Sequence, residues 1–201
     1  MTETHWPNLS EADFIIRDFR FASGETLPEL RQHYFTFGTP GAPAVLLIHN
    51  TTGTAKTWLE PSLADELFGP GQPLDVKRHY VVMVDNLGHG ASSKPSDGLR
   101  AEFPRYNYED MVRAQHRLVT EGLGLRRLRL VIGNSMGGLI STMVTSRVPD
   151  RVRGVVLLAP ALRASAGAGL RIGWNRSTVV TADAAFSRED AQFFVGFNQS
   201  Y

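Results

Sequence analysis

The sequence predicts an α/β protein in which a mostly parallel sheet is flanked by helices and preceded by an antiparallel hairpin. Three observations predict this class. Short, nearly continuous apolar runs are typical of parallel strands that are covered on both faces. Segments with a helical spacing of apolar residues lie between these runs, and such alternation implies right-handed crossover connections. The first part of the chain instead carries aromatic residues in extended spacing on both sides of a turn.

The elements follow one another in the order that this architecture needs. The hairpin is predicted from residues 14–21 and 34–37, joined by turn residues at 23–26. The parallel strands are the apolar runs at residues 44–48, 80–84, 128–132 and 152–158. The helices are predicted at residues 55–68, 107–121 and 136–147. Asn107 is a suitable capping residue for the second of these helices, and Pro149 closes the third.

The chain divides at about residue 161. Residues 1–161 contain every predicted strand and helix, and we interpret them as the N-terminal part of one α/β core. Residues 162–201 begin with small residues and continue with aromatic residues in no clear strand period, which we interpret as the start of a helical cap or lid. A length of 201 residues is that of one domain, and a hydrophobic content of 42% is sufficient for a packed core.

The composition excludes several classes of function. The formal charge is +1 and the basic residues are scattered, so neither nucleic acid nor an anionic membrane is expected as a partner. The chain has no cysteine, which excludes disulfides, thiolate metal sites and a cysteine nucleophile. Its six histidines are dispersed without the spacing of metal ligands, so no metal site is expected. No signal peptide or transmembrane run is recognisable, which favours a cytoplasmic protein. The oligomeric state stays open.

The strongest chemical signal is the segment GNSMGG at residues 133–138, which matches the pattern G-x-S-x-G. The segment lies between a strand and a helix, so Ser135 is predicted at the top of a sharp turn. Gly133 and Gly137 are needed there because a side chain at either position would collide with the adjoining backbone. We interpret Ser135 as the nucleophile of a nucleophile elbow. The alternatives are a glycine-rich packing turn and a phosphate-binding turn.

The turn after the first parallel strand, residues 49–53, is predicted to supply part of an oxyanion hole. Acyl transfer through a serine builds negative charge on the carbonyl oxygen, and two backbone N–H groups stabilise that charge. One donor is the amide of Met136, directly after the serine, and the other is the amide of Thr51. His49 is expected to have a structural role, because no acidic partner is identifiable near it. The turn at residues 85–92 is expected to be architectural.

These motifs together resemble the α/β-hydrolase superfamily and, within it, the branch that includes homoserine O-acetyltransferases. The resemblance covers about residues 13–160, and its most specific parts are the elbow and the segment DMVRAQ at residues 110–115. It implies an α/β-hydrolase fold and an acyl-enzyme mechanism, with Ser135 as nucleophile and Thr51 and Met136 as oxyanion donors. In the acetyltransferases the acyl group passes from acetyl-CoA to the hydroxyl of homoserine, whereas related hydrolases pass it to water. The implied partners are small-molecule esters, thioesters or acyl-CoA, with no other cofactor.

Two positions depart from the acetyltransferase pattern. Glu109 stands where arginine is usual, and Asn134 stands where glycine is common. Because of Glu109, we expect a serine hydrolase that acts on an ester or thioester. An acyltransferase that uses acetyl-CoA is the alternative.

The triad of this fold requires an acid and then a histidine after the serine. Acidic residues follow Ser135, but all six histidines precede it. A serine hydroxyl without a base is a poor nucleophile at neutral pH. We therefore expect the chain to be an N-terminal fragment whose remaining strands, acid and histidine lie beyond Tyr201. The other possibilities are that an upstream histidine substitutes, or that the protein is a catalytically silent binding protein.

Overall fold

The computed structural model describes residues 6, 8–160, 166–175, 178–186 and 191–199. The strands form one mixed sheet in the order β1-β2-β4-β3-β5-β6-β7-β8-β9. The strands are β1 (Ser10–Arg20), β2 (Thr26–Gly38), β3 (Ala44–Ile48), β4 (Tyr80–Val84), β5 (Leu130–Asn134), β6 (Gly154–Pro160), β7 (Ala166–Asn175), β8 (Thr178–Phe186) and β9 (Ala191–Gln199). The helices are η1 (Ala55–Leu59), α1 (Pro61–Leu67), η2 (Pro95–Asp97), η3 (Arg100–Glu102), α2 (Tyr108–Arg117), η4 (Leu118–Gly122), α3 (Met136–Arg147) and η5 (Pro149–Arg151).

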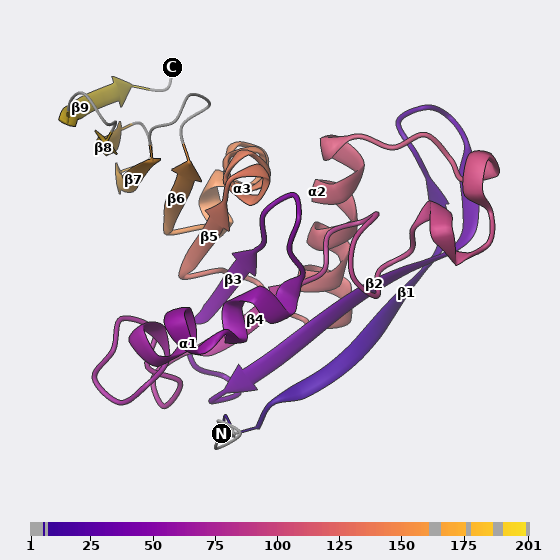
Figure 1. Ribbon diagram of the computed structural model, residues 1–201, viewed down its shortest axis with the longest axis horizontal. Helices are drawn as coiled ribbons and strands as arrows, with labels where there is room; N and C mark the ends of the chain where they lie inside the picture. The colour runs from indigo at the N-terminus through magenta and orange to yellow at the C-terminus, as the bar shows by residue number, and fades with distance from the viewer. Residues whose placement is uncertain (1–5, 7, 161–165, 176–177, 187–190, 200–201) are drawn as a thin grey trace.

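The central strands β4, β3, β5 and β6 are parallel, and the hairpin of β1 and β2 joins them through an antiparallel pairing of β2 with β4 (Figure 1). Helices connect the parallel strands that follow one another in the chain, as crossover connections require. The strands predicted at residues 44–48 and 80–84 coincide with β3 and β4, and the helix predicted at residues 136–147 coincides with α3. The expected α/β class with an N-terminal hairpin is therefore confirmed.

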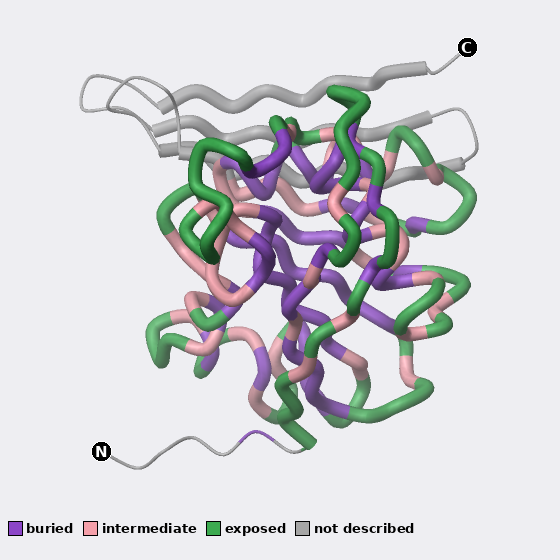
Figure 2. The backbone as a smooth tube through the Cα atoms, turned by 90° about the vertical axis from the view of Figure 1, so that its right-hand side faces the viewer, coloured by how far each residue is buried: buried purple, intermediate pink, exposed green. Residues whose placement is uncertain are grey.

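An apolar layer covers each face of the central sheet. Leu46 and Ile48 of β3 belong to the cluster that contains residues of α2 and α3, whereas Val45 and Leu47 belong to the cluster that contains residues of η1 and α1. Figure 2 shows buried chain through the middle of the molecule and exposed chain in the connecting loops. In a strand that is covered on both faces, polar and apolar residues do not alternate. All five residues of β3 are therefore apolar and buried.

Helix α2 begins at the predicted cap. The side chain of Asn107 accepts hydrogen bonds from the amides of Glu109 (2.9 Å) and Asp110 (3.2 Å), and the Asp110 carboxylate accepts one from the amide of Asn107 (3.1 Å). The other oxygen of this fully buried carboxylate accepts a bond from the amide of Ala22 at 2.8 Å. The start of the DMVRAQ segment therefore attaches α2 to the end of the hairpin.

Two predicted helices are interrupted. The helix expected at residues 55–68 consists of η1 and α1, because Pro61 is the first residue of α1 and has no N–H to continue the preceding turn. The helix expected at residues 107–121 is α-helical to Arg117 and continues as the π-helix η4.

The region after residue 161 differs from the helical character expected of it. Its described backbone forms β7, β8 and β9, which extend the sheet from β6 in antiparallel pairs. The segments contain β-branched and aromatic residues, which favour strands over helices. The assignment of residues 162–201 to a cap or lid stays a prediction.

Within the described part of the chain, every helix is too short or too polar to cross a lipid bilayer. In the same residues, no three His, Asp or Glu side chains gather as metal ligands would.

Candidate active site

Ser135 occupies the turn between β5 and α3, where the chain leaves the carboxyl edge of the parallel strands. Its backbone has φ 54° and ψ −113°, a conformation that is rare for a residue with a side chain. The amide of Ser135 donates to the carbonyl of Leu158 in β6 at 2.7 Å, and its carbonyl accepts from the amide of Gly138 at 2.9 Å. Bonds on both sides therefore hold the turn, and the serine itself is only half-buried.

Gly133 and Gly137 allow the first turn of α3 to lie directly against the sheet. A Cβ atom at Gly137 would fall on the carbonyl oxygens of Ile48 and His49, at the end of β3. A Cβ atom at Gly133 would fall on the carbonyl of Gly137 and the hydroxyl of Ser141. Only glycine permits this approach without displacement of the backbone. As a result, the Ser135 turn lies beside the turn that follows β3.

That neighbouring turn contains Thr51. Ile48 pairs with Gly133 in the parallel ladder, so β3 and β5 end at the same level and their turns leave the sheet together. Met136 is the first residue of α3, where helix amides have no acceptor within the helix. Neither the Thr51 amide nor the Met136 amide donates a hydrogen bond to another described residue. Both amides are thus available to an oxygen atom placed between the two turns.

A buried polar network lies beneath the Thr51 turn. Nε2 of His49 accepts from the amide of Asn86 at 2.9 Å, so Nδ1 carries the proton and donates to the carbonyl of Asn50 at 2.6 Å. The Asn86 side chain donates to the carbonyl of His49 at 3.3 Å and accepts from Gln115 at 2.7 Å. His49, Asn86 and Gln115 are each at most 1% exposed. These bonds set the directions of the peptides that lead into Thr51, in keeping with the structural role expected for His49.

The neutral state of His49 makes stability depend on pH. Burial lowers the pKa of this imidazole below 6.5, a shift that the Asn50 carbonyl partly opposes and His89 reinforces. The unfolded chain therefore binds a proton that the native chain excludes, so stability is present above about pH 6.5 and falls as the pH is lowered from there. Urea unfolding at about pH 7.5 and pH 5.5 should show this loss, and His49→Gln should reduce the difference. An undiminished difference in the variant would contradict the assignment. Burial also lowers the pKa of His116, which should account for the pH dependence of stability that remains in the His49→Gln variant.

The fold and the Ser135 turn can be compared with known proteins. A model of the alpha/beta hydrolase fold matches residues 43–190. The chain belongs to the α/β-hydrolase fold family. The hydrolase fold expected from the motifs is therefore confirmed.

The similar members of this family include homoserine O-acyltransferases, which confirms the expected branch. Homoserine O-succinyltransferase of Aromatoleum aromaticum is 38% identical over 162 residues, which are 72% of this chain and 43% of that protein. Homoserine O-acetyltransferase of Geotalea daltonii is 34% identical over 169 residues, which are 75% of this chain and 46% of that protein. An acetylester hydrolase from Corynebacterium glutamicum has a similar structure, with a TM-score of 0.65 and 25% identity over 73% of this chain and 43% of that one. This hydrolase-fold chain spans less than half the length of the curated relatives it matches.

The histidines in the turns around Ser135 of this hydrolase fold are engaged with the backbone. Both ring nitrogens of His49 take part in the network above. In His89, Nε2 lies 2.9 Å from the carbonyl of Thr51 and Nδ1 lies 3.2 Å from that of Leu87. No described side chain hydrogen-bonds the Ser135 hydroxyl. The described residues therefore give no support to the possibility that an upstream histidine serves as the base for Ser135.

Asp85 organises the turn that follows β4. One oxygen of its buried carboxylate accepts from the amide of Ala55 at 2.6 Å, and the other accepts from the amide of Ala91 at 2.8 Å. These bonds connect the turn to η1, the first helical turn after the Thr51 loop. The residues 85–92 thus have the architectural role that their glycines predict.

Glu109 lies far from the Ser135 turn. Its carboxylate pairs with the guanidinium of Arg147, at the last residue of α3. Ser135 precedes the first residue of the same helix, so about 18 Å of helix separates the two ends, at about 1.5 Å per residue. The difference from the acetyltransferases at Glu109 therefore affects the contact between α2 and α3. It gives no reason to prefer a hydrolase over a transferase.

Sequence reasoning missed three residues of the site: Asn86, His89 and Gln115. Gln115 ends the DMVRAQ segment, which was a usable signal because a polar residue on an apolar helix face needs a buried partner. Asn86 and His89 lie in the turn that was expected to be architectural. Their contacts with His49 and Thr51 join segments that are distant in sequence, and no local pattern reports such contacts.

Proposed function

We propose that this protein acts as an acyltransferase that carries the acyl group on Ser135, with an acyl-CoA donor and the hydroxyl of homoserine or a similar amino alcohol as acceptor. The observation that carries the proposal is the conformation of Ser135, held at φ 54° and ψ −113° beside the Thr51 turn. Such strain persists only where the surrounding structure imposes it, and it is common at reactive residues. The proposal places the protein in the cytoplasm, where acyl-CoA is available.

The chemistry follows from the groups that the two turns present. The Ser135 oxygen attacks the thioester carbonyl, the carbon–sulfur bond breaks, and the CoA thiol leaves with the serine proton. The acceptor hydroxyl then attacks the acyl-serine ester, which forms the new ester and returns a proton to the serine. Each step passes through an oxyanion, and the amides of Met136 and Thr51 stabilise it by a few kcal/mol. In this proposal the base and its acid partner lie outside the described residues.

The choice of an alcohol over water as acceptor is supported by the relatives. Two relatives, 38% and 34% identical to this chain over the aligned residues, are named homoserine O-succinyltransferase and homoserine O-acetyltransferase. The contrary argument from Glu109 fails because that residue pairs with Arg147 at the far end of α3. An ester or thioester hydrolase is the second candidate, favoured by the structural similarity to an acetylester hydrolase.

The donor and the acceptor can be tested together. The full-length protein is given acetyl-CoA or succinyl-CoA, with and without homoserine, and release of the free thiol is followed. We expect thiol release that depends on homoserine and the appearance of O-acyl-homoserine by mass spectrometry. Thiol release at the same rate without homoserine would favour the hydrolase and overturn the proposed acceptor.

A further inference from the structure

Strand β1 forms one edge of the sheet, and within the described residues it pairs with β2 alone. The strand is 11 residues long and lies along the outside of the molecule in Figure 1. An edge of this length presents unpaired backbone N–H and C=O groups, which can form hydrogen bonds with another strand.

The bonds of β2 show which backbone groups of β1 face this free edge. The amide of Arg31 donates to the hydroxyl of Ser93 at 2.8 Å, and its carbonyl accepts from the Ser93 amide at 2.9 Å. The amide of His33 donates to the hydroxyl of Ser92 at 2.9 Å, and its carbonyl accepts from the Asp85 amide at 3.0 Å. Both residues therefore direct their backbone groups away from β1.

The residues opposite them in β1 direct their own backbone groups outward. Ile15 lies opposite Arg31 in the antiparallel register. Asp13 lies opposite His33. In such a pair without mutual hydrogen bonds, the N–H and C=O groups of the two residues point away from each other. The free edge therefore carries the backbone groups of Asp13, Ile15 and, two residues further along, Arg17.

The side chains of these three residues lie on one face of β1, because successive side chains of a strand alternate. One oxygen of Asp13 contacts Nδ1 of His33 at 2.6 Å, which holds the carboxylate on this face. Ile15 is 42% exposed, although it is a large apolar residue. Arg17 forms no ion pair with another described residue. The order along the edge is thus acid, apolar residue, base.

This order is complementary to itself when a second copy runs antiparallel with the two-fold axis at Ile15. Asp13 of each copy then lies opposite Arg17 of the other, and the two Ile15 side chains meet. Opposite charges in such cross-strand pairs are stabilising and like charges are destabilising. An axis at Asp13 or Arg17 would oppose like charges, and an axis at Phe14 or Ile16 would place Ile15 against a charged side chain.

We propose that two copies of this protein associate through their β1 edges, antiparallel and with the two-fold axis at Ile15. The backbone groups of Asp13, Ile15 and Arg17 in each copy then bond to those of Arg17, Ile15 and Asp13 in the other. A two-fold interface uses the same surface in both copies, so the association stops at a pair. The interface is separate from the proposed acyl transfer and does not depend on it.

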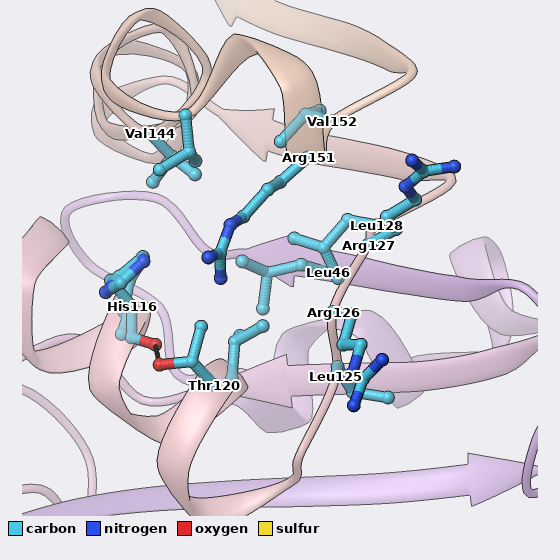
Figure 3. A pocket seen from close by; sticks show the side chains of 13 residues that line it. Leu46, His116, Thr120, Leu125, Arg126, Arg127, Leu128, Val144, Arg151 and Val152 are labelled. Carbon is cyan, nitrogen blue, oxygen red and sulfur yellow. Dashed lines mark hydrogen bonds between the residues drawn. The ribbon is translucent and has the colours of Figure 1, made fainter.

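Charge reversal and analytical ultracentrifugation of the full-length protein test the interface. Asp13→Arg and Arg17→Asp should each weaken the association about tenfold or more, because each places like charges opposite in both pairs. The particle mass of each variant should therefore be half that of the unchanged protein, whatever other interfaces exist. Arg127→Asp makes the same change of charge at an exposed arginine before β5 (Figure 3) and should leave the mass unchanged.

Mixing the two single variants separates a lost interface from a folding defect. Each copy then supplies the charge that the other lacks, so Asp13→Arg and Arg17→Asp together should recover the mass of the unchanged protein. Single variants that keep the full mass, or a mixture that stays at half of it, would overturn the proposal.

A cross-link at the axis keeps every charge in place. The 201 residues contain no cysteine, so Ile15→Cys adds a single thiol to them. Opposite residues in an antiparallel pair have Cβ atoms about 4.5 to 5.5 Å apart, so a short bis-maleimide should join two copies of this variant. Tyr108→Cys, at a side chain that is 41% exposed on α2, should give no more joined product than the unsubstituted protein. Equal joining in the two variants, or none at Ile15→Cys, would contradict an axis at Ile15.

Discussion

Replacing Ser135 by alanine is expected to lower the rate of acyl transfer by on the order of 10⁴-fold or more, with the fold unchanged. The variant has no side-chain oxygen to attack the thioester and carry the acyl group, although the Thr51 and Met136 amides remain. Steady-state thiol release with acetyl-CoA or succinyl-CoA measures this loss. A fluorophosphonate that labels the full-length protein should fail to label the variant. Such a result would also exclude a catalytically silent protein, which keeps the Ser135 turn only as part of its fold.

Ser146→Ala is the matched control. Ser146 lies on the same helix, is exposed, and bonds only to the carbonyl of Met143 at 2.9 Å. Its loss should change neither the rate nor the labelling. Labelling that persists in Ser135→Ala, or disappears in Ser146→Ala, would require another nucleophile and would end the proposed mechanism.

Replacing Gly137 by alanine is expected to lower the free energy of unfolding by about 3 kcal/mol or more. The added Cβ would fall on the carbonyl oxygens of Ile48 and His49, which belong to the backbone and cannot rotate away. Either α3 moves off β3 or the turn that carries Thr51 is displaced, so acyl transfer should fall together with stability. Urea unfolding followed by circular dichroism measures the first effect, and thiol release measures the second.

Gly138→Ala is the comparison that isolates the clash. Gly138 is the next residue of α3, and a Cβ there would lie 3.4 Å from the carbonyl oxygen of Gly133, at the near limit of ordinary contact. Alanine inside a helix is otherwise more favourable than glycine by up to about 1 kcal/mol. We expect Gly138→Ala to be nearly neutral. Equal destabilisation by the two substitutions would show that the close approach at Gly137 is not the cause.

Much of the core could be predicted because its signals are local. An apolar run such as residues 44–48 reveals a strand covered on both faces, and Asn107 followed by Asp110 reveals a helix start. The Ser135 turn is also encoded locally, since glycines two positions before and after a serine are what a sharp strand-to-helix turn requires. The helical character expected after residue 161 was wrong for the described backbone, because small and aromatic residues without a clear period do not distinguish a cap from added strands.

The residues near one another along the chain were thus enough to locate the parallel strands, the helices between them and the serine on its turn. Which distant segments touch was settled only by folding. The register of Ile48 with Gly133 brings the Thr51 turn beside Ser135, and the chain from Gln115 through Asn86 to His49 joins three separate segments beneath it. The ion pair of Glu109 with Arg147 likewise depends on the tertiary structure, and it places Glu109 away from the Ser135 turn. Propensity and periodicity act over a few residues, whereas sheet register and buried hydrogen bonds depend on how all the elements pack.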